Sequence, residues 1–221
     1  MPRRKIVFAT GEVYHIFNRS IAKEEVFASK YELNTALEVV NFYRFPQKLR
    51  LSKFKLLNQE VKKAYIDSLK NTDPLVEIYA FSFMPNHYHF LLKQLQDNGI
   101  PKFVSNFQNS FAKIFNLKRS RNGAVFQSQF KAKRPETDEE FLHISRYIHL
   151  NPVTAYLIKF DELANYPWTS FRFYNYGNGV SLVNTKTLIG ISSSRESYLK
   201  FVANQVDYQK TLDEIKHFIL E

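Results

Sequence analysis

Residues 76–92 read VEIYAFSFMPNHYHFLL, and this stretch decides the fold. The first run, 76–83, is mostly apolar and typical of a buried strand, and a second apolar run covers 88–93. Between them Pro85 and Asn86 interrupt the pattern with residues that favour turns. Two apolar runs that meet at a short break predict an antiparallel hairpin.

The hairpin carries two histidines, His87 and His89. Side chains alternate between the two faces of a strand, so both imidazoles are expected on one face and Tyr88 on the other. Neighbouring imidazoles on one face are a suitable pair of metal ligands. The alternative, two ordinary strand histidines, stays open from this pair alone, because six histidines in 221 residues can take this spacing by chance.

The rest of the chain predicts an α+β fold around the hairpin. Helical patterns alternate with strands, which favours one antiparallel sheet with helices packed on a face. Ser29 and Thr137 are suitable N-caps for two of the helices. In chain order we expect a strand at 13–18, a helix at 29–42, the hairpin, a helix at 101–116, a strand at 124–133 and a helix at 137–150.

Two segments lie outside this pattern. Residues 43–75 read as a basic insertion with a helix at 58–69, which either contacts phosphate or is a solvated surface. Residues 176–221 read as a C-terminal extension that is mostly helical from 194 to 220. We therefore expect one main domain over 1–175, followed by this extension.

Composition narrows the class of protein. The chain has no cysteine, which excludes disulfides and thiolate metal sites. No run approaches the ~18 apolar residues of a membrane span, and the first residues do not resemble a signal peptide. We expect a soluble cytoplasmic protein without a membrane partner. The net charge of +10 indicates a polyanionic partner, most simply nucleic acid.

The positive charge is concentrated between Asp97 and Glu136, where the sequence contains no acidic residue. Phenylalanines are interleaved with the cations there, a composition that suits a groove for single-stranded nucleic acid. Four of these phenylalanines are spaced by four over 103–115, which predicts a core stripe of a helix. We therefore expect the cations of this stretch, and not these four phenylalanines, to contact the nucleic acid. The candidate nucleic-acid contacts are Lys118, Arg119, Arg121, Lys131, Lys133 and Arg134.

The predicted helix at 137–150 carries a second group of polar residues. Tyr147 and Asn151 are four residues apart, so a helix presents the phenol and the amide on one face. A helical tyrosine alone most often packs in a core, but the histidine pair and the cationic stretch favour a functional site. The position of His15 in the first strand stays open between the core, a sheet edge and the neighbourhood of a metal.

At this point the sequence resembles the HUH single-strand endonucleases, and more closely the REP-associated tyrosine transposases, the RAYT group. The likeness covers about residues 8–175 and rests on five separated segments in chain order. They are 14–19 (YHIFNR), 84–89 (MPNHYH), 123–131 (GAVFQSQFK), 146–153 (RYIHLNPV) and 166–170 (YPWTS).

The resemblance implies a ferredoxin-like core, a divalent metal (Mg or Mn) and cleavage of single-stranded or hairpin DNA. Carried over to this sequence, His87 and His89 are metal ligands, Asn151 is the third metal-facing group and Tyr147 is the nucleophile that forms a covalent 5′-phosphotyrosine. Two imidazoles and an amide form a weak magnesium site, which a scissile phosphate would complete. The protein would be nucleoid-associated through DNA, as a monomer or a homodimer.

Two other interpretations remain. One is a domesticated nucleic-acid-binding protein that does not cleave, although such a protein need not keep His87, His89 and Tyr147. The other is a metal phosphohydrolase with water as nucleophile, which lacks the additional Asp and Glu ligands expected near the histidines.

Overall fold

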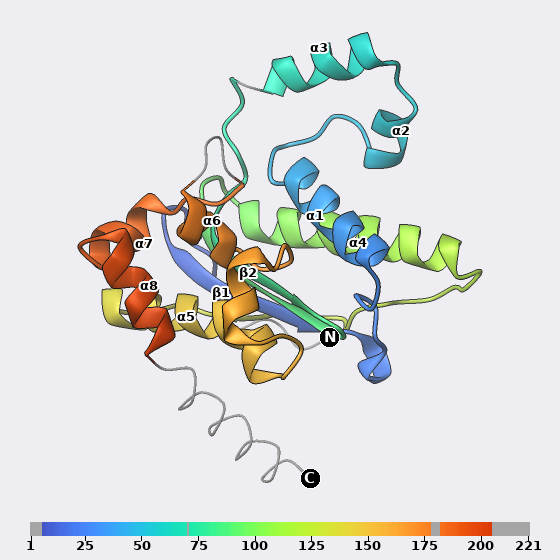
Figure 1. Cartoon of the computed structure of the whole chain (residues 1–221). Coiled ribbons are helices and arrows are strands. Elements are labelled where there is room, and N and C mark those ends of the chain that lie inside the picture. The colour runs from blue at the N-terminus through green and yellow to red at the C-terminus, as the bar shows by residue number, and fades with distance from the viewer. Residues whose placement is uncertain (1–5, 70, 178–181, 205–221) are drawn as a thin grey trace.

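The computed structural model describes residues 6–69, 71–177 and 182–204. Its centre is a four-stranded sheet in the order β2-β3-β1-β4, in which all neighbours are antiparallel (Figure 1). This order, with one helical crossover between β1 and β2 and another between β3 and β4, is the ferredoxin-like arrangement that the sequence predicted. The strands are β1 (Val13–Arg19), β2 (Val76–Met84), β3 (His87–Gln94) and β4 (Lys131–Lys133).

One face of the sheet is covered by α1 (Lys30–Tyr43) and α4 (Gly99–Lys118). The phenylalanine stripe of α4 is buried, and Phe90 of β3 lies 5.5 Å from Phe107 between ring centroids. The four spaced phenylalanines are therefore core residues, as predicted. Ser29 is the N-cap of α1, as predicted, and it forms a capping box with Glu32.

The opposite face is covered by α5 (Asp138–Thr154), whose first turn is capped by Thr137. The expectation of helices on one face was therefore incomplete. The reason lies in β3, where Leu91 shares the face of the histidines and is fully buried, so this face also needs a cover. Pro152 lies inside α5, which continues through it to Thr154.

The segment after α5 covers the outer edge of β2. Backbone amides and carbonyls pair across this edge, from Phe83 N to Trp168 O at 3.1 Å and from Ser170 N to Phe81 O at 3.0 Å. An edge strand that is paired in this way is not exposed to association with other chains. The elements here are the 3₁₀ helix Phe160–Asn165, α6 (Phe171–Tyr176), α7 (Lys186–Ile191) and α8 (Arg195–Ala203).

The basic insertion forms α2 (Leu51–Lys55) and α3 (Gln59–Leu69), which confirms the predicted helix. Figure 1 shows both helices beyond α1, away from the sheet. None of the eleven residues of α3 is buried, and Tyr65 anchors the helix by ring contact with Phe54 at 5.5 Å. The insertion is thus an appendage of the α1 side.

The predicted strand over 124–133 is wrong for most of its length. Only Lys131–Lys133 form β4, and upstream of it the described backbone forms one isolated bridge, between Phe126 and Ser20 at the end of β1. If the register between β1 and β4 continued, Ser20 would lie opposite residue 128. Ser20 pairs with Phe126 instead, so two extra residues form a bulge before β4. The side chain of Asn18 stabilises this bulge, because its Nδ2 donates to the Gln127 carbonyl at 3.0 Å.

The C-terminal helix α8 begins directly after Ser194, where the predicted helical segment starts, but residues 205–220 of that prediction lie outside the described residues. Tyr198 of α8 is fully buried, with its hydroxyl 2.8 Å from Ser145 Oγ and 3.0 Å from His149 Nδ1. The other nitrogen of His149 contacts Ser170 Oγ at 2.7 Å. This network joins α8, α5 and the segment beside β2.

Burial lowers the pKa of His149 to about 3, so the ring is neutral in the folded protein. A neutral ring needs both of its nitrogens satisfied when buried. Tyr198 and Ser170 do so, and they hold α5 in place on the sheet. In the part of the chain that the model describes, no helix has the length and apolar character to cross a membrane.

Tyr198→Phe removes one hydroxyl from this network and leaves the buried His149 Nδ1 without its partner, while Ser145 Oγ keeps its bond to the Leu142 carbonyl. We expect a loss of about 1–3 kcal/mol in the free energy of unfolding, measured by urea denaturation. Tyr31→Phe is the matched control, because Tyr31 is half exposed and its change should stay within about 0.5 kcal/mol. Equal stabilities of the two variants would contradict a structural role for the network.

Candidate active site

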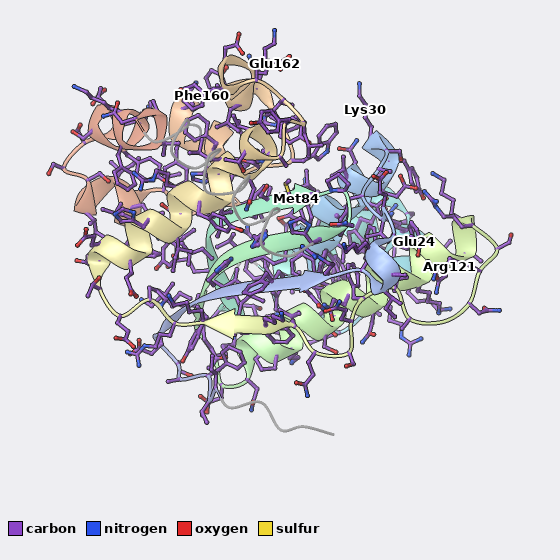
Figure 2. The ribbon with its side chains drawn as sticks, turned by 90° about the horizontal axis from the view of Figure 1, so that it is seen from below. Glu24, Lys30, Met84, Arg121, Phe160 and Glu162 are labelled. Atoms are coloured by element: carbon purple, nitrogen blue, oxygen red, sulfur yellow. The ribbon has the colours of Figure 1, made fainter. Side chains whose placement is uncertain are left out.

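Residues from β1, β3, β4, α5 and the segment before β4 line a cavity of about 260 Å³ on the α5 face of the sheet. Tyr147 enters it from α5, and the two histidines enter from β3. Figure 2 views the sheet from this side. The lining residues are Phe17, Asn18, Arg19, His87, His89, Gln127, Lys131 and Tyr147.

The rings lie close together. Between centroids, His89 is 5.1 Å from His87 and 5.6 Å from Tyr147, in edge-to-face arrangements. His15 of β1 stacks on His89 at 5.2 Å. The predicted shared face of His87 and His89 is confirmed, whereas Tyr88 packs on the α4 side against Phe107. The open question about His15 is also answered, since it contacts His89.

The Nδ1 atom of each predicted ligand has a partner. His87 Nδ1 lies 2.7 Å from Asn86 Oδ1, and His89 Nδ1 lies 2.9 Å from His15 Nε2. His89 Nε2 is buried and has no hydrogen-bond partner within the described ranges. A buried polar atom without a partner is rare, and a missing ligand is one explanation.

The histidines are held neutral. Burial, with a smaller contribution from the charge of Arg19, lowers the pKa of His87 to about 4. Burial also lowers the pKa of His89 well below its usual value, and that of His15 to about 4 with help from Lys133. Neutral imidazoles keep a lone pair at neutral pH, which is the form that binds metals.

This donor set fits a divalent cation only in part. Among the described residues no group of three or more His, Asp or Glu could hold a metal by itself. His89 Nε2, which has no hydrogen-bond partner among the described residues, is suited to bind a metal, and His87 lines the same cavity. Asn151 is buried but does not line the cavity, and its Nδ2 has no hydrogen-bond partner among the residues described.

The six predicted DNA contacts separate into two groups. Lys131 lines the cavity, and Lys133 lies opposite His15 in the β1–β4 ladder, so both lysines share the face of the site. The other four lie in ion pairs with glutamates. The pairs are Lys118 and Arg119 with Glu32 at 3.8 and 3.3 Å, Arg121 with Glu24 (Figure 2), and Arg134 with Glu12 at 2.7 Å.

No role was predicted from the sequence for Arg19, Asn18 or Gln127. Arg19 ends β1 and pairs with His87 across the ladder. Its position in the segment 14–19 (YHIFNR) could therefore have indicated a role in the site. Gln127 reaches the cavity only through the bulge before β4, which no periodicity indicates.

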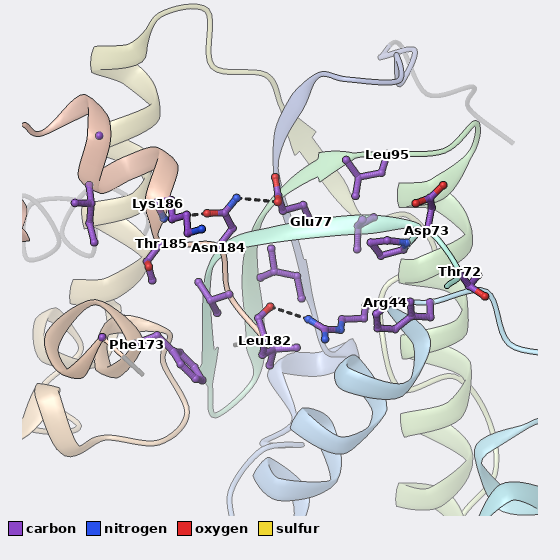
Figure 3. Close-up of a pocket in the computed structure, with 18 of the residues that line it drawn as sticks. Arg44, Thr72, Asp73, Glu77, Leu95, Phe173, Leu182, Asn184, Thr185 and Lys186 are labelled. Carbon is purple, nitrogen blue, oxygen red and sulfur yellow. Dashed lines mark hydrogen bonds between the residues drawn. The ribbon is translucent and has the colours of Figure 1, made fainter. Parts of the chain in front are cut away.

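A larger cavity of about 1140 Å³ lies beside the start of β2 and includes none of the predicted site residues (Figure 3). Its charges are mixed, and its polar groups bond to one another. Asn184 Nδ2 donates to Glu77 at 2.8 Å, and Arg44 donates to the Leu182 carbonyl at 3.4 Å. The smaller cavity is therefore the candidate active site.

Comparison with known proteins agrees with this geometry. Residues 48–151 match the family model described as "Transposase IS200 like". None of the curated proteins matches the chain. A solved REP-associated tyrosine transposase bound to a REP hairpin is 14% identical, with a TM-score of 0.51, over 83% of this chain and 94% of that one.

A second solved structure, a candidate transposase from Deinococcus radiodurans R1, is 14% identical with a TM-score of 0.37, over 67% of this chain and 95% of that chain. Over residues 48–151 the chain is therefore similar to the IS200-like transposases. Its fold is similar to that of a REP-associated tyrosine transposase, the group that the sequence motifs resemble.

Arg19→Gln should raise the pKa of His87 above about 4, because removal of a neighbouring positive charge makes protonation easier. The pKa should stay below 6.5, because burial, the larger cause, remains. A pH titration followed by NMR of the imidazole measures this, with the exposed Arg172→Gln as control. An unchanged pKa of His87 would place the Arg19 guanidinium away from the cavity.

Proposed function

We propose that the protein is a metal-dependent single-stranded DNA endonuclease and strand transferase with Tyr147 as its nucleophile. One observation carries the proposal: α5 brings the Tyr147 ring to 5.6 Å from His89, in the cavity that His87 also lines. A phenol beside two neutral imidazoles suits transfer of a phosphodiester to tyrosine. The hairpin bound by the structurally similar transposase supports single-stranded or hairpin DNA as the partner.

In the proposed step, the Tyr147 oxygen forms a bond to phosphorus and the bond from phosphorus to the 3′ oxygen breaks. The phenolic proton passes to solvent, and the departing 3′ oxygen takes up a proton. The products are a 5′-phosphotyrosine link and a 3′-hydroxyl. Attack by a second 3′-hydroxyl on this link reverses the step and joins two strands without an external energy source.

His87 and His89 would hold Mg or Mn through Nε2, with Asn151 as the proposed third group. A bound divalent metal withdraws charge from the scissile phosphate and so eases attack by a weak nucleophile such as tyrosine. The other residues of the cavity have binding tasks. Arg19 and Lys131 are exposed cations at its lining, suited to phosphate oxygens.

We propose that single-stranded DNA follows β4, where Lys131 and Lys133 share the face of the site. Lys118, Arg119, Arg121 and Arg134 would contact DNA further away, at the cost of their present glutamate pairs. The catalytic domain would comprise 1–175, including the insertion at 43–75. The extension 176–221 would support the tyrosine helix through Tyr198.

The nucleophile is tested with a labelled oligonucleotide on a denaturing gel. Tyr147→Phe should lose both the covalent adduct and cleavage while it still binds DNA, because it loses one oxygen and little volume. Tyr156→Phe, which alters an exposed tyrosine just after α5, should keep both. Mass spectrometry of the wild-type adduct should find the nucleotide on Tyr147.

A link to another residue would contradict the assignment of the nucleophile. Cleavage by Tyr147→Phe without any link would mean a water nucleophile and a hydrolase. DNA binding by the wild type with neither cleavage nor link, with Mn²⁺ present, would favour the non-cleaving nucleic-acid-binding protein.

The DNA path is tested by the salt dependence of binding. Lys131→Ala with Lys133→Ala should reduce the log–log salt slope for single strands by about 0.7 for each phosphate that the variant no longer neutralises. Arg119→Ala with Arg121→Ala removes the same charge from the end of α4 and should change the slope less. The opposite ranking would move the DNA path to the α1–α4 side.

A further inference from the structure

The Nδ1 contacts of the two predicted ligands have a chemical consequence. A neutral imidazole carries one proton, and the nitrogen without it is the acceptor and the potential metal ligand. Whichever group bonds to Nδ1 therefore decides whether Nε2 can bind a metal. For His87 this group is Asn86, and for His89 it is His15.

The Asn86 amide is oriented by its second contact. Its Nδ2 lies 3.4 Å from the carbonyl oxygen of Lys23, which can only accept. Its Oδ1 therefore faces His87 Nδ1 and can only accept there. The proton of His87 is then on Nδ1, and Nε2 has a lone pair.

The backbone around Asn86 is arranged for these contacts. Ala22 and Lys23 both have left-handed φ values of 54° and 56°, which is uncommon for residues other than glycine. Ser20 N donates to the Asn86 carbonyl at 2.8 Å, and Phe27 N donates to that of Pro85 at 2.9 Å. The loop after β1 thus holds the hairpin turn that carries Asn86.

The pair of His15 and His89 has two possible proton arrangements. In one, His89 Nδ1–H donates to His15 Nε2, and the buried His89 Nε2 is a lone pair. In the other, His15 donates, and His89 Nε2–H is a buried donor with no acceptor among the described residues. A buried donor without an acceptor is destabilising, and orphaned buried N–H groups are rarer than under-satisfied acceptors.

We propose that Asn86 and His15 are positioning residues that set the tautomers of His87 and His89, so that both rings present an Nε2 lone pair to one divalent cation. The proposal rests on the metal site of the proposed function and extends it to two residues outside the cavity lining. Partners of this kind fix the orientation and tautomer of metal-binding histidines, and their loss typically lowers metal affinity 10–100-fold.

The first test uses the metal-free, full-length protein without DNA. ¹⁵N NMR of the imidazoles should show His87 and His89 protonated on Nδ1 at pH 7. The Asn86→Ala and His15→Phe variants should each lose this tautomer preference at the ring they contact. A wild type with either ring protonated on Nε2 overturns the proposal.

The second test is Mn²⁺ binding measured by calorimetry. Asn86→Ala and His15→Phe should weaken binding about 10–100-fold, Asn86→Asp should restore much of it because it keeps the acceptor, and the surface variant Asn109→Ala should bind as the wild type does. Equal affinity of Asn86→Ala and wild type overturns the proposal, as does a wild type that binds no Mn²⁺. If Mn²⁺ binds as expected but no Tyr147 adduct forms, only the nucleophile assignment has failed.

Discussion

The structure depends on the alternation of side chains along β3. Tyr88 and Phe90 point to α4 and form the core, while His87, His89 and Leu91 point to α5. Since β3 is the strand between β2 and β1, both of its faces must be covered by helices. The helix that covers the second face, α5, also carries Tyr147. When α5 packs on the sheet, it therefore buries the apolar side chains of that face and brings Tyr147 to the histidines.

This arrangement places imidazoles in a buried environment, where a charged form is unfavourable. The histidines of the site therefore stay neutral, and their remaining hydrogen-bonding capacity must be met by neighbours. Asn86 and His15 meet it at Nδ1, which leaves the Nε2 atom of His89 without a partner among the described residues. A buried nitrogen of this kind is destabilising in the absence of a ligand, as is typical of functional sites.

Local patterns predicted much of this fold. Alternation at 87–89, helical spacing at 103–115 and the caps Ser29 and Thr137 act between near neighbours, and all were confirmed. The bulge before β4 depends on register against a strand more than 100 residues away, so the pattern at 124–133 was read as one long strand. For the same reason the glutamate partners of Arg119 and Arg121 could not be read from a stretch that has no acid of its own.

The central claim is that His87 and His89 hold a metal within reach of the Tyr147 hydroxyl. It is tested most directly by a crystal structure of Tyr147→Phe with Mn²⁺ and a single-stranded oligonucleotide, in which anomalous scattering locates the metal. We expect one anomalous peak about 2.0–2.3 Å from Nε2 of both histidines, with a phosphate between the metal and the ring at position 147. A metal bound elsewhere, or a phosphate that lies away from this ring, would contradict it.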